Sequence, residues 1–351
     1  MKHRLTPEQK TTLKKAAALL LGTVLLAGCF LAVPTIASAI PASFASYLTA
    51  EPPAELLAAL SAVHTDVTPL PPIVPTPPSE PTPPVLNTPA PVPDGAINVF
   101  ADSFCWYEPD ETPTLDLING TNFAVDLHAF LQKEYPISTP DAKEPLVLIV
   151  HTHGSESYLP DGTDYYLPDE DFRTTDPTQS VIAVGQVIAE SLDALGIPVL
   201  HDKTLHDTED FNRAYTYTRK TVESYLREYP SIRYVLDIHR DSIETAEGIC
   251  SKTLTSIDGV PTAQIMLVVG TNQNGASHSD WKTNLTVATY LQNRMTELYP
   301  TLARPLNLRA DAFNQSMSSG ALLVEVGSCG NTVTEAKNAA RLFAWAFASM
   351  I

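Results

Sequence analysis

The feature that most constrains the fold of this chain is a series of short, almost uninterrupted apolar segments in its C-terminal part. Longer segments, with apolar residues at helical spacing, separate them. The apolar segments are PLVLIVHTH (145–153), PVLHD (198–202), RYVLDIHRD (233–241), QIMLVVG (264–270) and ALLVEVG (321–327). A strand that is apolar on both faces needs cover on both faces, which is typical of parallel sheets between layers of helices. The sequence therefore predicts an α/β fold, with a mainly parallel sheet and helices on both faces.

The segments between these strands carry helix start and stop signals. The predicted helices are 180–196, 211–230, 281–300 and 332–350. Gly196 stands at the end of the first, where glycine commonly ends a helix. The next two end in proline, which cannot continue a helix. The last begins with Thr332 or Thr334 as its N-cap.

The N-terminal part has the charge pattern of a membrane-anchored protein. Residues 1–15 are basic, and residues 16–40 are uncharged and long enough to span a bilayer. The basic flank places the N-terminus in the cytoplasm and the rest outside, in a single-pass arrangement at the cell membrane. The alternatives are signal-peptidase cleavage at ASA (37–39) and lipid attachment at LAGC (26–29). In all three cases the remainder of the chain is expected outside the cytoplasm.

A proline-rich spacer follows the predicted membrane segment. Residues 41–97 combine a juxtamembrane segment with TPLPPIVPTPPSEPTPPVLNTPAPVP (68–93). Proline removes backbone donors, so this stretch predicts extended polyproline II. A stretch of this length reaches roughly 80 Å at about 3.1 Å per residue, which would hold a domain well away from the membrane. The folded extracytoplasmic domain is expected at residues 98–351.

Composition argues against some partners and sites. The formal net charge is -18, and a nucleic-acid partner is not expected because phosphate binding needs Lys and Arg. The four cysteines are widely spaced and form no CxxC pair, so a cysteine-rich zinc site is not expected either. The three cysteines beyond the membrane segment allow at most one disulfide, and the sequence does not identify the pair.

Polar residues with metal-binding chemistry end three of the predicted strands. His151 and His153 end the first, His239 lies at the end of another, and Glu325 lies near the end of the last. In open α/β sheets, sites form beyond the carboxyl ends of the strands, so these side chains should gather at one edge. Two histidines and a carboxylate are a standard ligand set for catalytic zinc. The sequence therefore predicts a zinc site at this edge.

His153, Glu156 and His239 are the predicted zinc ligands, and Glu325 is the predicted catalytic carboxylate that moves protons. Side chains alternate along a strand, which places His151 on the same face as His153, so either histidine could bind the metal. His151 otherwise contacts substrate or supports the ligands. Each signal alone is weak, because a lone strand-end histidine is more often structural and H-x-x-E occurs by chance.

Four motifs, in this order, resemble the stage II sporulation protein P family: HTHGSESY (151–158), HDKTLHD (201–207), DIHRDS (237–242) and LLVEVGSCGN (322–331). The resemblance covers the chain from about residue 145 to the C-terminus. That family looks like a divergent branch of the zinc-dependent N-acetylmuramoyl-L-alanine amidases, which implies an amidase-like fold and Zn2+ as cofactor. By this resemblance His153 and His239 match zinc-binding histidines, and Glu325 matches the catalytic glutamate.

The position of the carboxylate ligand differs from that in the wider amidases. There the carboxylate ligand lies well downstream of the first histidine, on a helix, whereas Glu156 is only three residues on. Glu170 is the alternative ligand. Arg240 and Asn331, which stand in the matched motifs, are expected with His151 to bind substrate or to support the ligands.

The resemblance also implies a biological setting. It implies hydrolysis of the bond between muramic acid and L-alanine in peptidoglycan, with endopeptidase action on cross-links as a further activity. The setting would be thinning of the forespore septum during engulfment, with the stage II sporulation proteins D and M as partners. Two rival functions remain open: a zinc carboxypeptidase-like peptidoglycan peptidase, and a wall-binding scaffold without turnover.

Overall fold

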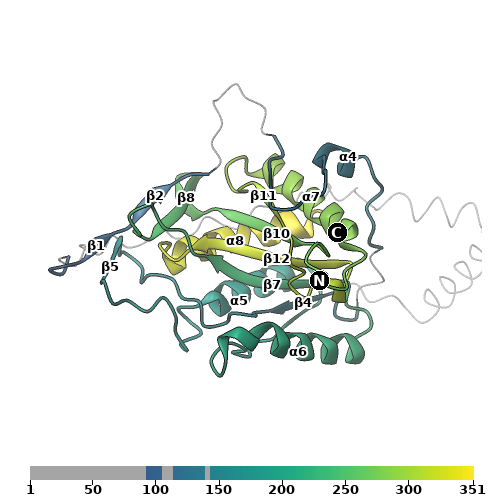
Figure 1. The fold of residues 1–351 in the computed structure, drawn as a ribbon, viewed down its shortest axis with the longest axis horizontal. Helices are drawn as coiled ribbons and strands as arrows, with labels where there is room; N and C mark the ends of the chain where they lie inside the picture. The colour runs from purple at the N-terminus through teal and green to yellow at the C-terminus, as the bar shows by residue number, and fades with distance from the viewer. Residues whose placement is uncertain (1–91, 105–113, 139–142) are drawn as a thin grey trace, which may run out of the picture. The chain divides into compact units, whose positions relative to one another are not determined.

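The computed structural model describes residues 92–104, 114–138 and 143–351 (Figure 1). The predicted cytoplasmic tail, the membrane segment and almost all of the spacer lie outside the described residues. No helix in the described ranges is long and apolar enough to cross a membrane. The first described strand, β1 (Ile97–Asn98), begins where the folded domain is expected to start.

In the described part of the chain, a seven-stranded sheet forms the centre of the molecule (Figure 1). All neighbouring strands are parallel except β10 and β12, which are antiparallel. The prediction of a mainly parallel sheet is therefore confirmed. In spatial order the strands are β3 (Leu117–Asn119), β11 (Leu306–Arg309), β10 (Ile265–Gly270), β12 (Gly320–Ser328), β7 (Tyr234–Asp241), β4 (Val147–Val150) and β6 (Val199–His201).

Helices cover both faces of this sheet, as predicted. One face buries alternate residues such as Leu236 and Val324 in the main core. The other buries Leu148 and Val235 against Val222 of α6, and we call it the α6 face. The helices of the main core are α5 (Val181–Ala194), α7 (Trp281–Leu298) and α8 (Val333–Ala348), while α6 (Ala214–Glu228) covers the α6 face, at the bottom of Figure 1.

The helix ends follow local chemistry. Thr332, not Thr334, is the N-cap of α8: its hydroxyl accepts from the Glu335 backbone N–H, and Glu335 accepts from the Thr332 backbone in return. Gly196 follows α5 with a φ of 81°, a left-handed conformation that suits glycine. The remaining helical elements are α4 (Leu127–Leu131), the 3-10 turn η1 (Phe211–Arg213) and the 3-10 turn η2 (Gln315–Met317).

Two small sheets flank the central one. β2 (Phe100–Asp102) pairs with β8 (Ser251–Ile257), which forms a hairpin with β9 (Val260–Ala263). β1 pairs with β5 (Tyr165–Tyr166). The periodicity of the sequence predicts neither sheet.

A disulfide joins Cys250, just before β8, to Cys329, just after β12. The sequence separation is 79 residues, and closing so long a loop removes much of the entropy of the unfolded chain. We expect the Cys250→Ser/Cys329→Ser variant to lose about 4 kcal/mol of unfolding free energy. Denaturant titration of the oxidised wild type and the variant measures this loss. A loss below about 1 kcal/mol would show that the cross-link contributes little.

Candidate metal centre and catalytic site

The register between β7 and β12 places His239 beside Glu325. The two strands are parallel, and Glu325 pairs with His239 across them. Alternation puts His239 on the same side of β7 as Val235, which packs on the α6 face. Both side chains therefore lie on the α6 face near the carboxyl ends of their strands, where sites form in open α/β sheets.

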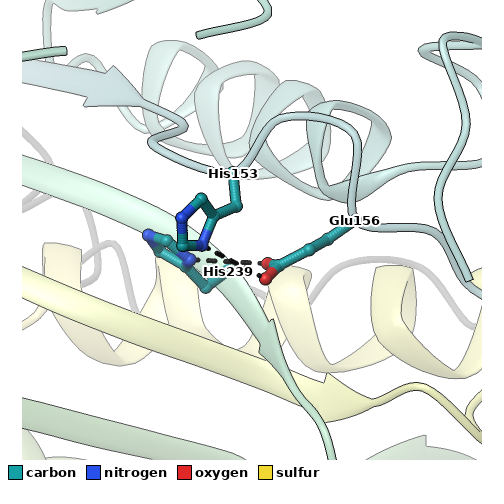
Figure 2. A group of neighbouring side chains, drawn as sticks. All are labelled: His153, Glu156 and His239. Atoms are coloured by element: carbon teal, nitrogen blue, oxygen red, sulfur yellow. Dashed lines mark ion pairs between the residues drawn. The ribbon is translucent and has the colours of Figure 1, made fainter. Parts of the chain in front are cut away.

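A turn after β4 brings two more side chains to the same place. β4 ends at Val150, and the Glu156 backbone N–H then donates to the His153 carbonyl. His153 Nδ1 lies 3.5 Å from Glu156 Oε1, and His239 Nδ1 lies 3.4 Å from Glu156 Oε2. Figure 2 shows both rings facing the one carboxylate. The structure thus brings together the three residues predicted as ligands.

The spacing and chemistry of this group fit a zinc ion. One donor atom from each of His153, Glu156 and His239 lies within 4.8 Å of the others. Ligands held tetrahedrally at about 2.0–2.2 Å from zinc lie about 3.4 Å apart, close to the two separations above. Two imidazole nitrogens and a carboxylate oxygen are also a standard donor set for catalytic zinc.

Asp237 supports the His239 ring from its other side. His239 Nε2 lies 3.0 Å from Asp237 Oδ1, at an angle that makes no hydrogen bond. Asp237 is itself fixed by Thr152, whose backbone N–H and hydroxyl donate to its two oxygens at 2.8 and 2.6 Å. A zinc-binding histidine commonly directs its second ring nitrogen at a carboxylate. Asp237 is missing from the predicted site, although its place two residues before His239 puts both on one face.

The electrostatics of the group favour a bound cation. Burial lowers the pKa of His239, but Asp237 and Glu156 outweigh it and raise that pKa well above its usual value. Burial raises the pKa of the Glu156 carboxyl, but His153, His239 and Arg240 outweigh it and hold that pKa well below its usual range. In the metal-free protein a protonated His239 ring lies between the Glu156 and Asp237 carboxylates, and a metal ion would replace the proton on its Nδ1.

Glu325 is a buried carboxyl with an unused oxygen. Its Oε2 has no hydrogen-bond partner, and its cross-strand neighbours are His239 on β7 and Met266 on β10. Burial, partly offset by His239, raises the pKa of Glu325 to about 8. A carboxyl that titrates near neutral pH can both accept and donate a proton during a reaction.

This buried carboxyl should cost stability at high pH. The folded state keeps the proton of Glu325 up to about pH 8, whereas the unfolded chain loses it near 4.5. Stability is therefore fully present below pH 4.5 and falls as the pH rises through 8. In metal-free protein, Glu325→Gln should be more stable than wild type at pH 9 by roughly 2–4 kcal/mol, with little difference at pH 4.5. Denaturant titrations with a chelator measure the gap, and a pH-independent gap would contradict the burial of an ionisable Glu325.

His151 lies apart from the predicted ligands. The chain leaves the strand at Val150, so the alternation that would place His151 beside His153 ends there. His151 is fully buried, donates from Nδ1 to the Ile238 carbonyl and contacts His201 Nε2 at 2.8 Å. It packs against α5, where a side chain on Gly185 would come within 2.6 Å of its ring. His151 is therefore neither placed to bind the same metal nor open to substrate.

The other predicted supporting residues hold backbone in place. The Arg240 backbone N–H donates to Glu156 Oε2 at 3.2 Å, while its guanidinium donates to the carbonyls of Ser157 and Phe172. Asn331 is fully buried and hydrogen-bonds both backbone groups of Thr253, so it ties the end of β12 to β8 and does not reach substrate. Glu170 is exposed in a turn and does not belong to the metal-ligand group.

Aromatic side chains form one wall of the site. The Phe211 ring stacks on His153 at 4.4 Å, and the Tyr215 ring meets His153 edge-on at 5.6 Å. The Arg173 guanidinium lies over Phe211, 4.2 Å from its centre. Phe211 is 44% exposed, which leaves an apolar surface beside the predicted ligands.

The family model of stage II sporulation protein P (SpoIIP) matches residues 111–348. The chain therefore belongs to the stage II sporulation protein P family. Stage II sporulation protein P of Bacillus subtilis (strain 168) is 29% identical over 236 residues, which are 62% of this chain and 54% of that protein. The chain thus spans about half the length of this curated relative.

Several solved structures show a weaker likeness. The N-acetylmuramoyl-L-alanine amidase AmiC2 of Nostoc punctiforme is 16% identical with a TM-score of 0.36, over 60% of this chain and 97% of that one. The apo N-acetylmuramyl-L-alanine amidase Ami1 of Mycobacterium abscessus is 14% identical with a TM-score of 0.36, over 60% of this chain and 97% of that one.

Proposed function

We propose that this chain is a zinc-dependent N-acetylmuramoyl-L-alanine amidase that cleaves septal peptidoglycan during sporulation. The observation that carries the proposal is the His153–Glu156–His239 group beside the buried, unpartnered Glu325. A ligand set for catalytic zinc next to a carboxyl that titrates near neutral pH supports hydrolysis of an amide. Membership of the stage II sporulation protein P family supports the sporulation setting.

Each residue has a distinct part in this reaction. Zinc held by His153, Glu156 and His239 would supply a Lewis acid that polarises the amide carbonyl and activates water. Asp237 and the Arg240 N–H keep His239 and Glu156 oriented. The ionised form of Glu325 would be favoured by a zinc ion held beside it, so that Glu325 Oε2 accepts the proton of the attacking water and passes it to the nitrogen of the leaving L-alanine.

The rest of the proposal concerns where the enzyme works. The basic tail, the apolar segment and the spacer support a domain held outside the cytoplasm on a membrane anchor, at the forespore septum. The wall polymer is insoluble and cannot diffuse to the membrane, so an anchored enzyme needs a spacer to contact it. The stage II sporulation proteins D and M are the proposed partners, and cleavage of peptide cross-links is the proposed additional activity.

Digestion of purified peptidoglycan by the full chain tests this function, with the products read by mass spectrometry. An amidase releases intact stem peptides and leaves muramic acid without peptide, and a chelator should stop the release. Shortened peptides still attached to the glycan would instead indicate the carboxypeptidase-like enzyme. No new product with zinc-loaded, folded protein would indicate the wall-binding scaffold.

A further inference from the structure

A cleft of about 830 Å³ opens beside α6. Its walls come from the first turns of α6, the loop before α7 and the loop before β12. The lining residues that matter here are Tyr215, Arg219, Ser277, Phe313, Asn314 and Ser316. Ligand-binding pockets commonly have volumes of about 300–1,000 Å³, so the cleft can hold a substrate fragment.

One side chain joins this cleft to the metal-ligand group. Tyr215 lines the cleft, and its ring meets His153 edge-on with 5.6 Å between ring centres. Its ring also lies 5.9 Å from that of Phe313, which belongs to the loop before β12, so the two aromatic rings form one continuous surface. A molecule bound in the cleft would therefore be separated from His153 by the Tyr215 side chain alone.

The cleft is held in shape before any ligand binds. The Asn314 side chain donates to the Tyr215 carbonyl at 2.8 Å and so ties two walls together. Phe313 and Asn314 both have positive φ, 48° and 59°, a conformation that persists only where its surroundings enforce it. Buried Gln315 accepts from the Gly270 N–H, and Gly270 lets this loop approach more closely than any side chain would allow. A preformed cleft binds its ligand with less loss of entropy.

The lining is amphipathic, and its one cation and one anion both already have a partner. Arg219 pairs with Glu223 at 2.9 Å, and Asp311 accepts from the Asn274 side chain at 2.8 Å. The aromatic rings, hydroxyl groups and one amide that remain suit a sugar, because the C–H face of a pyranose stacks on aromatic rings while its hydroxyl and acetamido groups form hydrogen bonds. A stem peptide, with its ionised carboxylates, would meet a cation that is already paired and the like charge of Asp311.

We propose that this cleft is the subsite for the glycan strand, with the N-acetylmuramic acid ring packed against the edges of Tyr215 and Phe313 that face the cleft. This assignment rests on the proposed function. It further states on which side of the scissile bond the glycan strand binds. In the substrate the lactyl carbonyl joins the muramic acid ring through a single ether, so that sugar must lie beside the reacting carbonyl. A cleft that begins one ring away from His153 meets this requirement.

Calorimetric binding to the full chain tests the subsite without turnover, in a Glu325→Gln background. The glycan probe is a tetrasaccharide of alternating N-acetylglucosamine and N-acetylmuramic acid, with its lactyl groups capped as simple amides. Ser277→Trp and Ser316→Trp fill the cleft from two walls and should each weaken glycan binding at least tenfold. Ser224→Trp, an exposed serine of α6 outside the cleft, is the matched control and should not change it.

The same variants are titrated with a free stem peptide that begins with L-alanine, whose binding should not change. Glycan binding that survives both cleft-filling variants would overturn the subsite, as would loss of peptide binding in its place. This outcome is distinct from failure of the proposed function. Glycan binding that depends on the cleft, together with no release of stem peptides by the wild type, would keep the subsite and reject the amidase.

Discussion

Glu325→Gln should lower the rate of stem-peptide release from peptidoglycan by about 10²–10⁴-fold while zinc stays bound. Glutamine keeps the shape of the side chain but cannot take up a proton. Glu325 does not belong to the ligand group, and its Oε2 has no other partner, so the substitution removes the proton carrier without removing a ligand. The rate is measured by mass spectrometry of timed digests, and zinc by elemental analysis of the same protein.

A matched substitution makes this result specific. Glu170→Gln makes the same chemical change at an exposed glutamate that lies outside the metal-ligand group. It should leave both the rate and the zinc content unchanged. Wild-type release by the Glu325→Gln variant would remove Glu325 from the reaction, and loss of zinc in that variant would give it a different role.

His239→Ala should abolish both zinc binding and hydrolysis. His239 is one of the three proposed ligands, and its second ring nitrogen lies 3.0 Å from the Asp237 carboxylate. Loss of even an indirect support commonly costs 10–100-fold in metal affinity, so loss of the ligand itself should exceed about 100-fold. Zinc content after dialysis measures the effect, with circular dichroism to confirm that the variant is folded.

His151→Gln is the control for His239→Ala, because the sequence alone leaves His151 as an alternative ligand. The structure places its ring against α5 and His201, so zinc should remain at the wild-type level in folded protein. A folded His151→Gln variant without zinc would transfer the ligand role from His153 to His151. A normal zinc content in His239→Ala would reject the whole ligand set.

The layers of this fold could be predicted because apolar strands and amphipathic helices are local patterns. The direction of β10, which runs antiparallel to its neighbour β12, could not, because a strand buried on both faces reads the same in parallel and antiparallel pairing. The β8–β9 hairpin lacks a clear apolar pattern, because its strands are only partly apolar. Its turn residues, Asp258 and Gly259 at positive φ, are a usable hairpin signal in the sequence.

For the candidate site as well, local sequence patterns could predict some residues and not others. His239 and Glu325 could be predicted as neighbours, since both end apolar strands of one sheet. The choice between His151 and His153 could not, because it depends on the residue at which β4 stops and the chain turns. Asp237 gave a usable signal, a carboxylate two residues before a predicted ligand on the same strand. The glycan cleft gave none, since distant loops form its walls.

Zinc K-edge absorption of the full, zinc-loaded chain tests the central claim most directly, because it reports the atoms bound to the metal. We expect two imidazole nitrogens and oxygen ligands around the zinc, no sulfur, and the same spectrum for folded His151→Gln. We also expect loss of one imidazole, or of the metal, in His153→Ala. A sulfur ligand, or a spectrum that changes with His151 and not with His153, would contradict this claim.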